Sequence, residues 1–178
     1  RAAGTRMISH WFDDVPDAID MLAEAVVDPH PRVRLEAVNA LCEVGTLEAF
    51  IVAMRAADHP ADTFLAYALR LTARELQKLW LPALQDGKDV FEGRSARMTL
   101  AFSIATDRRA LAPLVALIRE GKVANRANAC RIVTTMGGKD EMTFVFSLAA
   151  ENSNVELLQV LADASRTNKA VPTDISAL

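Results

Sequence analysis

Apolar residues recur at helical spacing along most of this chain, and short polar turns separate the runs. In residues 28–41, Pro31 opens a segment whose apolar positions follow every three or four residues, and Gly45 closes it. Proline suits the first turn of a helix, and glycine suits the position just after its end. The same pattern returns in degenerate form around Ile8, Leu71, Ile104, Val133 and Leu161.

This recurrence has a nearly regular period. With Leu41 as the centre of the clearest segment, the successive spacings from Ile8 onward are 33, 30, 33, 29 and 28 residues. A period of this size is typical of stacked helical repeats, in which each pair of helices buries the apolar side of the next. The pattern therefore predicts an all-α chain, a right-handed α-α superhelix of about ten or eleven helices.

The helices expected from the pattern can be placed along the chain. They cover residues 1–12, 17–27, 31–44, 46–57, 61–80, 94–106, 108–120, 122–136, 140–150 and 154–165. Within residues 61–80 a wide apolar surface is expected from Phe64, Leu65, Ala68, Leu69, Leu71, Leu76 and Leu79. Residues 82–93 contain Pro82 and two glycines and are predicted to be irregular, held to the core by Leu84, Val90 and Phe91. One domain is expected over residues 1–165, followed by a weakly ordered tail over 166–178.

Residues 31–41 carry a resemblance to a known family. They combine the opening proline, two arginines at Arg32 and Arg34, and the run Ala-Val-x-Ala-Leu. These features resemble the HEAT-repeat (ARM-like) family, and the match is loose after residue 90, where Arg97 and Arg126 are the only comparable arginines. The resemblance implies a HEAT-like solenoid that serves as a binding scaffold, and such a solenoid would use an exposed concave or edge surface.

A narrower resemblance is carried by residues 1–6, 15–20, 28–41 and 58–69, followed by Trp80. These stretches resemble a helical segment of large proteins of Planctomycetes and Verrucomicrobia, where it lies between a dehydrogenase-like β-propeller and a C-terminal cytochrome c domain. The resemblance covers residues 1–106 and implies a spacer or docking module of an extracytoplasmic, periplasmic redox or sugar-processing protein. The family's haem motif, Cys-x-x-Cys-His, is absent here. Because the sequence begins inside a predicted repeat, we expect a piece of a longer protein.

The arginines at predicted inner-helix positions are the candidate interaction residues: Arg32, Arg34, Arg70, Arg74, Arg97 and Arg126. They either line a concave surface for an anionic ligand or pair with Glu36, Asp62, Glu75 or backbone carbonyls and tie the repeats together. The net charge of the chain is −3. A nucleic-acid-binding surface usually carries excess positive charge, so the charge balance favours the structural alternative and argues against a nucleic-acid partner.

Two turns combine histidine with aspartate and proline. His30 lies beside Asp28, and His59 lies beside Asp58 with Asp62 nearby. Such turns either form a metal or acid–base site or cap the helices that follow, because aspartate accepts hydrogen bonds from helix N–H groups. A metal site requires three or four convergent ligands, so capping is favoured and no metal is predicted.

Cysteine and tryptophan are expected in the core. Cys42 and Cys130 lie about three repeats apart, or roughly 25–30 Å if neighbouring helices are about 10 Å apart. A disulfide requires Cα atoms within about 7 Å, so both cysteines are predicted to be buried thiols. Trp80 is expected to cover the edge of the core.

The chain lacks the usual sequence signs of catalysis. No nucleophile has a convincing partner triad, Gly137-Gly138-Lys139 is not a Walker loop, and no paired carboxylates stand out. We therefore predict a non-catalytic protein-interaction or spacer module, without a cofactor, whose partner is another protein or a flanking domain. The alternatives are a helical-repeat lyase-type or nucleic-acid-binding protein with a concave arginine-lined surface, or a purely architectural element. No apolar run approaches the length of about 18 residues that a membrane span requires.

Overall fold

The structure is a computed structural model of the chain, which describes residues 1–12, 14–123, 125–151 and 154–168. Within these ranges it contains eleven α-helices, two short 3₁₀ helices and no strand, so the prediction of an all-α chain is confirmed. The chain forms two compact units, residues 1–105 and residues 106–178. The single domain expected over residues 1–165 therefore contains a boundary between two units. In the described ranges, every helix is too short or too polar to cross a membrane.

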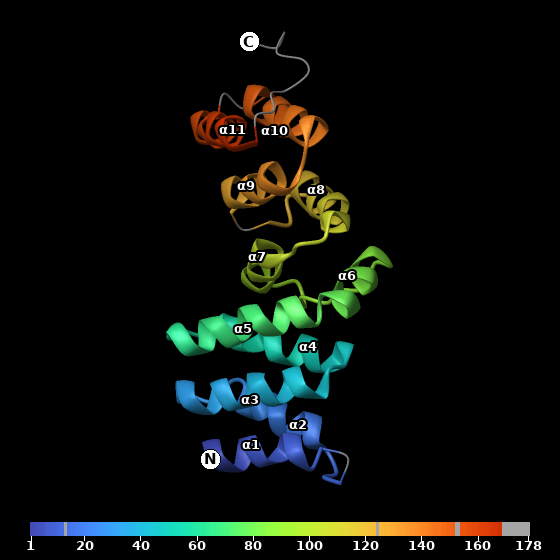
Figure 1. Cartoon of the computed structure of the whole chain (residues 1–178), viewed down its shortest axis with the longest axis vertical. Coiled ribbons are helices and arrows are strands. Elements are labelled where there is room, and N and C mark those ends of the chain that lie inside the picture. Colours follow the sequence, from blue (N-terminus) through green and yellow to red (C-terminus); the bar gives the residue numbers. More distant parts are fainter. Residues whose placement is uncertain (13, 124, 152–153, 169–178) are drawn as a thin grey trace. The chain divides into compact units, whose positions relative to one another are not determined.

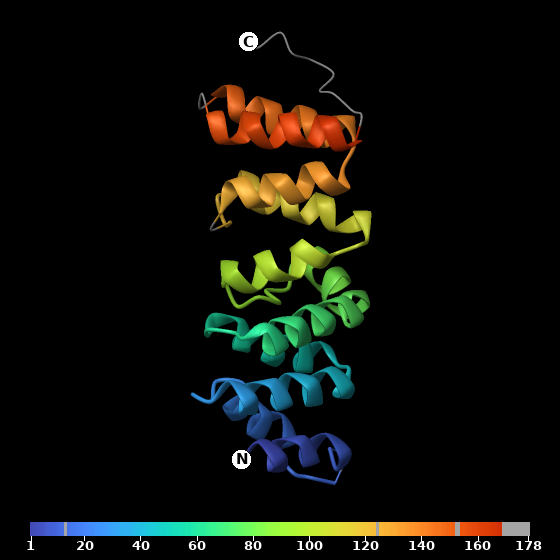
Figure 2. The same cartoon turned by 60° about the vertical axis from the view of Figure 1, so that its left-hand side comes forward.

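Unit 1 consists of two layers of helices (Figures 1 and 2). α1 (Ala2–His10), α3 (Pro31–Val44), α5 (Thr63–Glu75) and α7 (Ser95–Ile104) pack side by side in one layer. The second layer contains α2 (Ala18–Ala25), α4 (Leu47–Met54) and α6 (Gln77–Gln85), and α4 continues into a 3₁₀ turn, η1 (Arg55–Asp58). The seven helices correspond in order to the predicted ones, except that two of them replace the predicted helix 61–80.

α3 lies at the centre of unit 1 and forms as its sequence predicts. Pro31 occupies the first turn, and the N–H of Arg32 donates to His30 Nδ1 at 3.2 Å. Gly45 ends the helix in the left-handed conformation, with φ of 69°, which an L side chain adopts only at a cost. The helix packs against α1, α2, α4 and α5, and it buries side chains on two sides, among them Val33, Ala37, Val38, Ala40 and Leu41. A helix with this pattern is enclosed by its neighbours.

The predicted helix over residues 61–80 is broken into α5 and α6 at Leu76. Next to the break, the indole Nε1 of Trp80 donates to the carbonyl oxygen of Ala73 at 2.8 Å. α6 then continues through Pro82 to Gln85, although a helix end before this proline was expected. Pro82 and the residue four positions earlier, Lys78, are both exposed, so water can satisfy the carbonyl that proline leaves unpaired.

An aromatic cluster forms the core where α4, α6 and α7 meet the segment between α6 and α7. Trp80 stacks on Phe50 with ring centroids 5.9 Å apart, and it contacts Phe91 and Phe102 at 5.8 and 5.7 Å. Val90 and Phe91 are buried, so the prediction that the core holds this segment is confirmed for them, whereas Leu84 is only partly buried and belongs to α6. Phe64 was expected in the same apolar surface as Leu65, but 71% of it is exposed. That prediction is wrong, because the buried face of α5 is set by Leu65, Ala68 and Leu69.

Unit 2 begins with a 3₁₀ turn, η2 (Arg108–Ala110), followed by α8 (Leu111–Arg119), α9 (Arg126–Met136), α10 (Lys139–Glu151) and α11 (Val155–Asn168). α8 packs on α9, and α9, α10 and α11 pack on one another (Figures 1 and 2). α9 starts later than expected because Asn125 caps it by accepting the N–H of Asn128 at 2.8 Å. α11 includes residues 166–168, which were assigned to the tail. The rest of the predicted tail, residues 169–178, lies outside the described residues.

Candidate functional site

The Asp/His/Pro turns make the contacts of helix caps. Asp28 Oδ1 accepts the N–H of His30 at 2.8 Å, and His30 in turn caps α3. Asp62 caps α5 by accepting the N–H of Leu65 at 2.8 Å. In the part of the chain that the structure describes, no three His, Cys, Asp or Glu side chains are grouped to hold a metal ion. The hydrogen bonds of His30 and Asp62 thus agree with the capping alternative, whereas Asp58 pairs with Arg97.

Two of the predicted interaction arginines are buried and tie separate segments of unit 1 together. Arg34 is 4% exposed, and its guanidinium donates to the carbonyls of Asp28 at 2.7 Å, Pro29 at 3.0 Å and Pro60 at 2.6 Å. Arg97 is 6% exposed, and its Nη2 lies 2.6 Å from Asp58 Oδ2. Both arginines therefore link turns that are far apart in the sequence, and neither is available as part of an exposed surface.

Glu92 extends the Arg97 contact into a network of five charged side chains, which also includes Arg94, whose Nε lies 3.7 Å from Asp58 Oδ2. Both Arg97 and Arg55 donate to Glu92, and the Arg55 Nη2–Glu92 Oε1 distance is 2.6 Å. The hydrogen bond from Arg55, aided by Arg97 and opposed by partial burial, lowers the pKa of Glu92 from 4.5 to about 2. The network joins the segment before α7 to η1 and so holds the loop that carries Phe91.

The Glu92→Gln substitution is expected to change how stability depends on pH. Because the pKa of Glu92 is lower in the folded protein than in the unfolded chain, its contribution is complete above pH 4.5 and is lost as the pH falls towards 2. E92Q should therefore be less stable than the natural protein at pH 7, and the difference should shrink between pH 4.5 and 2. Urea unfolding at pH 7 and pH 3 measures this.

The matched control is Glu24→Gln, an exposed glutamate on α2. E24Q should lose stability between pH 7 and pH 3 as steeply as the natural protein does. If E92Q also follows that pH dependence, then the Glu92 carboxylate does not form the ion pairs described above.

The other four predicted arginines are exposed. Arg74 lies 3.6 Å from Glu75 on the same helix, and Arg70 makes no ion pair with the described residues. Arg126 lies at the start of α9 in unit 2. Arg32 lines the groove of unit 1 described below, and the other five predicted arginines do not line that groove.

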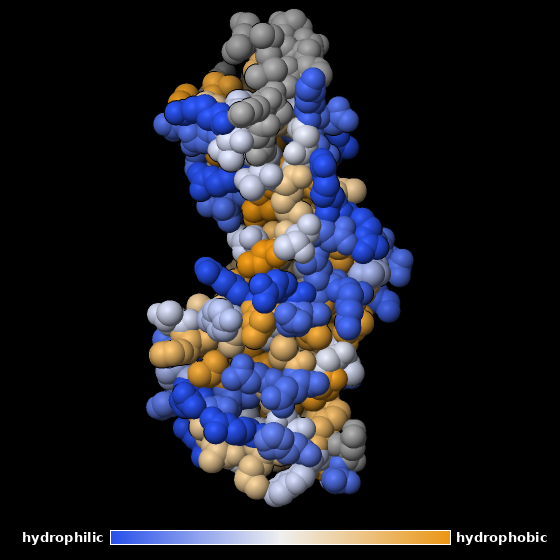
Figure 3. Space-filling view, in the orientation of Figure 1, coloured by the Kyte–Doolittle hydropathy of each residue, from blue (hydrophilic) through white to orange (hydrophobic). Residues whose placement is uncertain are grey.

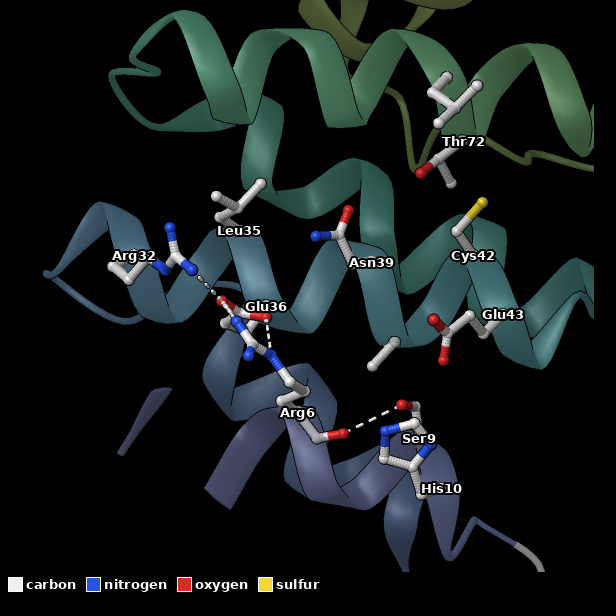
Figure 4. A pocket seen from close by; sticks show the side chains of 12 residues that line it. Arg6, Ser9, His10, Arg32, Leu35, Glu36, Asn39, Cys42, Glu43 and Thr72 are labelled. Carbon is white, nitrogen blue, oxygen red and sulfur yellow. Dashed lines mark hydrogen bonds and ion pairs between the residues drawn. The ribbon is translucent and has the colours of Figure 1, made fainter. Parts of the chain in front are cut away.

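A groove of about 380 Å³ runs along α3, with α1 on one side and α5 on the other. Figure 4 shows Arg32 near one end of the groove, Asn39 in the middle and Glu43 near the other end. These three side chains are exposed, as are Arg6 and His10 on the α1 side. In Figure 3, hydrophilic and hydrophobic residues are interspersed over α1, α3 and α5, without a continuous apolar face in that view. The groove is thus an open surface depression with mixed chemistry.

One end of the groove is formed by a buried carboxylate and two exposed guanidinium groups. Glu36 accepts hydrogen bonds from Arg6 Nε at 2.9 Å and Arg6 Nη2 at 2.6 Å, and Arg32 Nη2 lies 2.8 Å from Glu36 Oε1. The Glu36 side chain is 6% exposed, whereas those of Arg6 and Arg32 are 58% and 56% exposed. The hydrogen bond from Arg6 is the main reason that the pKa of Glu36 is lowered. One negative charge faces two positive charges, so this end carries a net positive charge.

The remainder of the groove has an apolar stretch and an acidic end. Leu35, Ala40 and Leu71 line it, and Glu43 follows Glu36 by seven residues along α3. At the α-helical rise of 1.5 Å per residue, the two carboxylates are about 10 Å apart along the helix axis.

The two cysteines lie in different environments. Cys42 also lines the groove, and its sulfur points towards Thr72 of α5 (Figure 4). It is partly exposed, so the prediction that it is buried is wrong. Cys130 in unit 2 is buried as predicted, and burial raises the pKa of its thiol to about 11. Neither is in a disulfide.

The contribution of Arg6 was missed at the level of the sequence. Arg32 and Glu36 stand at the i,i+4 spacing that brings side chains together on a helix. Arg6 precedes Glu36 by 30 residues, which is one repeat period, and this spacing is the signal that was available. The spacing alone does not show that Arg6 and Glu36 meet; the packing of α1 beside α3 brings them together.

Comparison of the chain with protein-family models, with curated proteins and with solved structures finds no match to any of them.

Proposed function

We propose that the chain is a non-catalytic protein-interaction module whose unit 1 binds an extended segment of a partner protein in the groove on α1, α3 and α5. The groove itself is the observation that carries this proposal. It follows the length of one helix, it is bounded by the two neighbouring helices, and exposed side chains line it from end to end. An open depression of this kind suits a polypeptide, whereas small-molecule sites bury most of their ligand.

The charge of unit 1 favours a protein partner over a nucleic acid. The unit has eleven Lys and Arg against fifteen Asp and Glu, which gives a net charge of −4. Two of its arginines are buried, and the charges of Arg6 and Arg32 are partly neutralised by Glu36. A surface that binds nucleic acid neutralises several phosphates with free cations. The geometry therefore gives no support to the lyase-type or nucleic-acid-binding alternative.

The finer architecture and the biological setting belong to the same proposal. We propose that the helices of unit 1 are stacked hairpins of the HEAT type, which is supported by the side-by-side packing of α1, α3, α5 and α7 and by the arginines that link successive turns. The resemblance to helical segments of planctomycetal and verrucomicrobial proteins supports a place in an extracytoplasmic, redox-associated protein. In that setting, the module docks a flanking domain or a separate protein.

Display of a random peptide library tests the groove. Peptides are selected on the 178-residue chain and then measured on two variants, Asn39→Trp and Met21→Trp. Asn39 is exposed in the middle of the groove, and Met21 is 48% exposed on α2 in the other layer. Blocking a central contact typically weakens binding by about tenfold or more.

We expect N39W to lose the selected peptides while M21W retains them, and circular dichroism should show both variants folded. If the selected peptides bind N39W as well as the natural chain, or if the library contains no binder, the proposed function is wrong.

A further inference from the structure

The guanidinium groups of Arg6 and Arg32 are both held by one carboxylate at the positive end of the groove. Glu36, which is buried, holds both guanidinium groups through three hydrogen bonds or ion pairs. Among the described residues, Arg6 Nη1 and Arg32 Nε and Nη1 have no hydrogen-bond acceptor. A guanidinium group offers five N–H donors in a fixed plane, which matches the two oxygens of a carboxylate. Because Glu36 leaves a net charge of about +1 at this end, a carboxylate balances it, whereas a phosphate dianion exceeds it.

The other end of the groove carries a negative charge and so favours a positively charged ligand group. Glu43 is exposed there, and the groove between the two ends is lined by Leu35, Ala40 and Leu71. A basic side chain suits Glu43, and an apolar side chain suits the middle. The groove therefore presents a positive end, a middle in which the exposed Asn39 lies among apolar side chains, and a negative end along one helix (Figure 4).

The spacing of these three features fits an extended peptide. Side chains of an extended chain alternate between two faces, so residues i, i+2 and i+4 lie on one face. Residues i and i+4 are about 13 Å apart at 3.3 Å per residue. Glu36, which both guanidinium groups contact, is about 10 Å from Glu43 along the α3 axis, by the helical rise. A long basic side chain accommodates the difference of about 3 Å.

We infer that the groove selects extended protein segments with an acidic residue, an apolar residue two positions away and a basic residue four positions away. The acidic carboxylate binds between Arg6 and Arg32, the apolar side chain lies over Leu35 and Leu71, and the basic side chain pairs with Glu43. This inference rests on the proposed function, because it names the class of segment that the groove accepts.

The test is a set of fluorescent peptides measured by anisotropy on the full chain. The host peptide contains Asp-Thr-Leu-Thr-Lys between Gly-Ser flanks, and single variants replace its Asp by Asn or its Lys by Gln. Each change should weaken binding to the natural chain by about tenfold, because each removes a charge-assisted hydrogen bond. Arg32→Gln should abolish the preference for Asp over Asn. Glu43→Gln should abolish only the preference for Lys over Gln.

The variants are chosen to preserve the fold. In R32Q, the two hydrogen bonds between Arg6 and Glu36 remain, and Glu43 is an exposed residue near the end of α3. A charge exchange gives a second readout: Glu43→Lys should bind a peptide whose Lys is replaced by Glu more tightly than it binds the host peptide.

The outcomes separate the inference from the proposed function. One outcome is that N39W weakens binding of the host peptide while the peptides with Asn for Asp or Gln for Lys bind the natural chain as tightly as the host does. In that case the groove binds peptides, but the inferred preference for an acidic and a basic residue is wrong. If N39W binds the host peptide as the natural chain does, the proposed function fails as well. If the preferences persist in R32Q and E43Q, the charged contacts lie elsewhere and the inference is overturned.

Discussion

The Ala37→Asp substitution is expected to unfold unit 1. Ala37 is 0% exposed in the middle of α3, and α3 packs against four other helices. A carboxylate at this position would be buried without a partner, which costs roughly 3–5 kcal/mol or more. That is a large share of the total stability of about 5–15 kcal/mol that a domain has. Leu41, also 0% exposed, should respond to Leu41→Asp in the same way.

The measurement is far-ultraviolet circular dichroism together with tryptophan fluorescence. Unfolding of unit 1 exposes Trp80, which is fully buried in the folded chain, so the emission should shift to longer wavelength. The control is Asn39→Asp, which introduces the same charge at an exposed position of the same helix. If A37D melts at the same temperature as N39D, the assignment of the buried face of α3 is incorrect.

The Trp80→Ala substitution should cause the second largest loss of stability. Trp80 contacts Phe50, Phe91 and Phe102 through its ring and the carbonyl of Ala73 through its indole N–H. Removal of a fully buried large side chain costs about 3–5 kcal/mol, because apolar burial is lost and a cavity remains. Urea unfolding followed by circular dichroism measures the change.

Trp11→Ala is the matched control, since Trp11 is 53% exposed at the end of α1. Its cost should stay below about 1 kcal/mol. Trp80→Phe keeps one aromatic ring but removes the indole hydrogen bond and part of the buried ring area, so its cost should lie between the two. Equal effects of W80A and W11A would show that the aromatic cluster is not the core of unit 1.

The groove contains one of the six arginines predicted as interaction residues, Arg32. The sequence periodicity predicted that Arg32, Arg34 and Arg97 all lie on inner helices. It did not show which of them are buried and which are exposed. Arg34 and Arg97 are surrounded by turns that approach from 26 and 39 residues away, and they are buried as a result. Arg32 has Glu36 on its own helix and remains more than half exposed. Burial thus depends on what packs over a position, which spacing along one helix does not encode.

Local chemistry was enough to predict the helices and many of their ends. Pro31, Gly45 and the capping Asp62 act within a few residues of themselves, so their effects are readable from the chain alone. The tertiary structure decided what depends on distant segments: the break at Leu76, the exposure of Phe64 and the meeting of Arg6 with Glu36. These features follow from which helices become neighbours, because burial and ion pairing are set by contacts between segments that are far apart in the sequence.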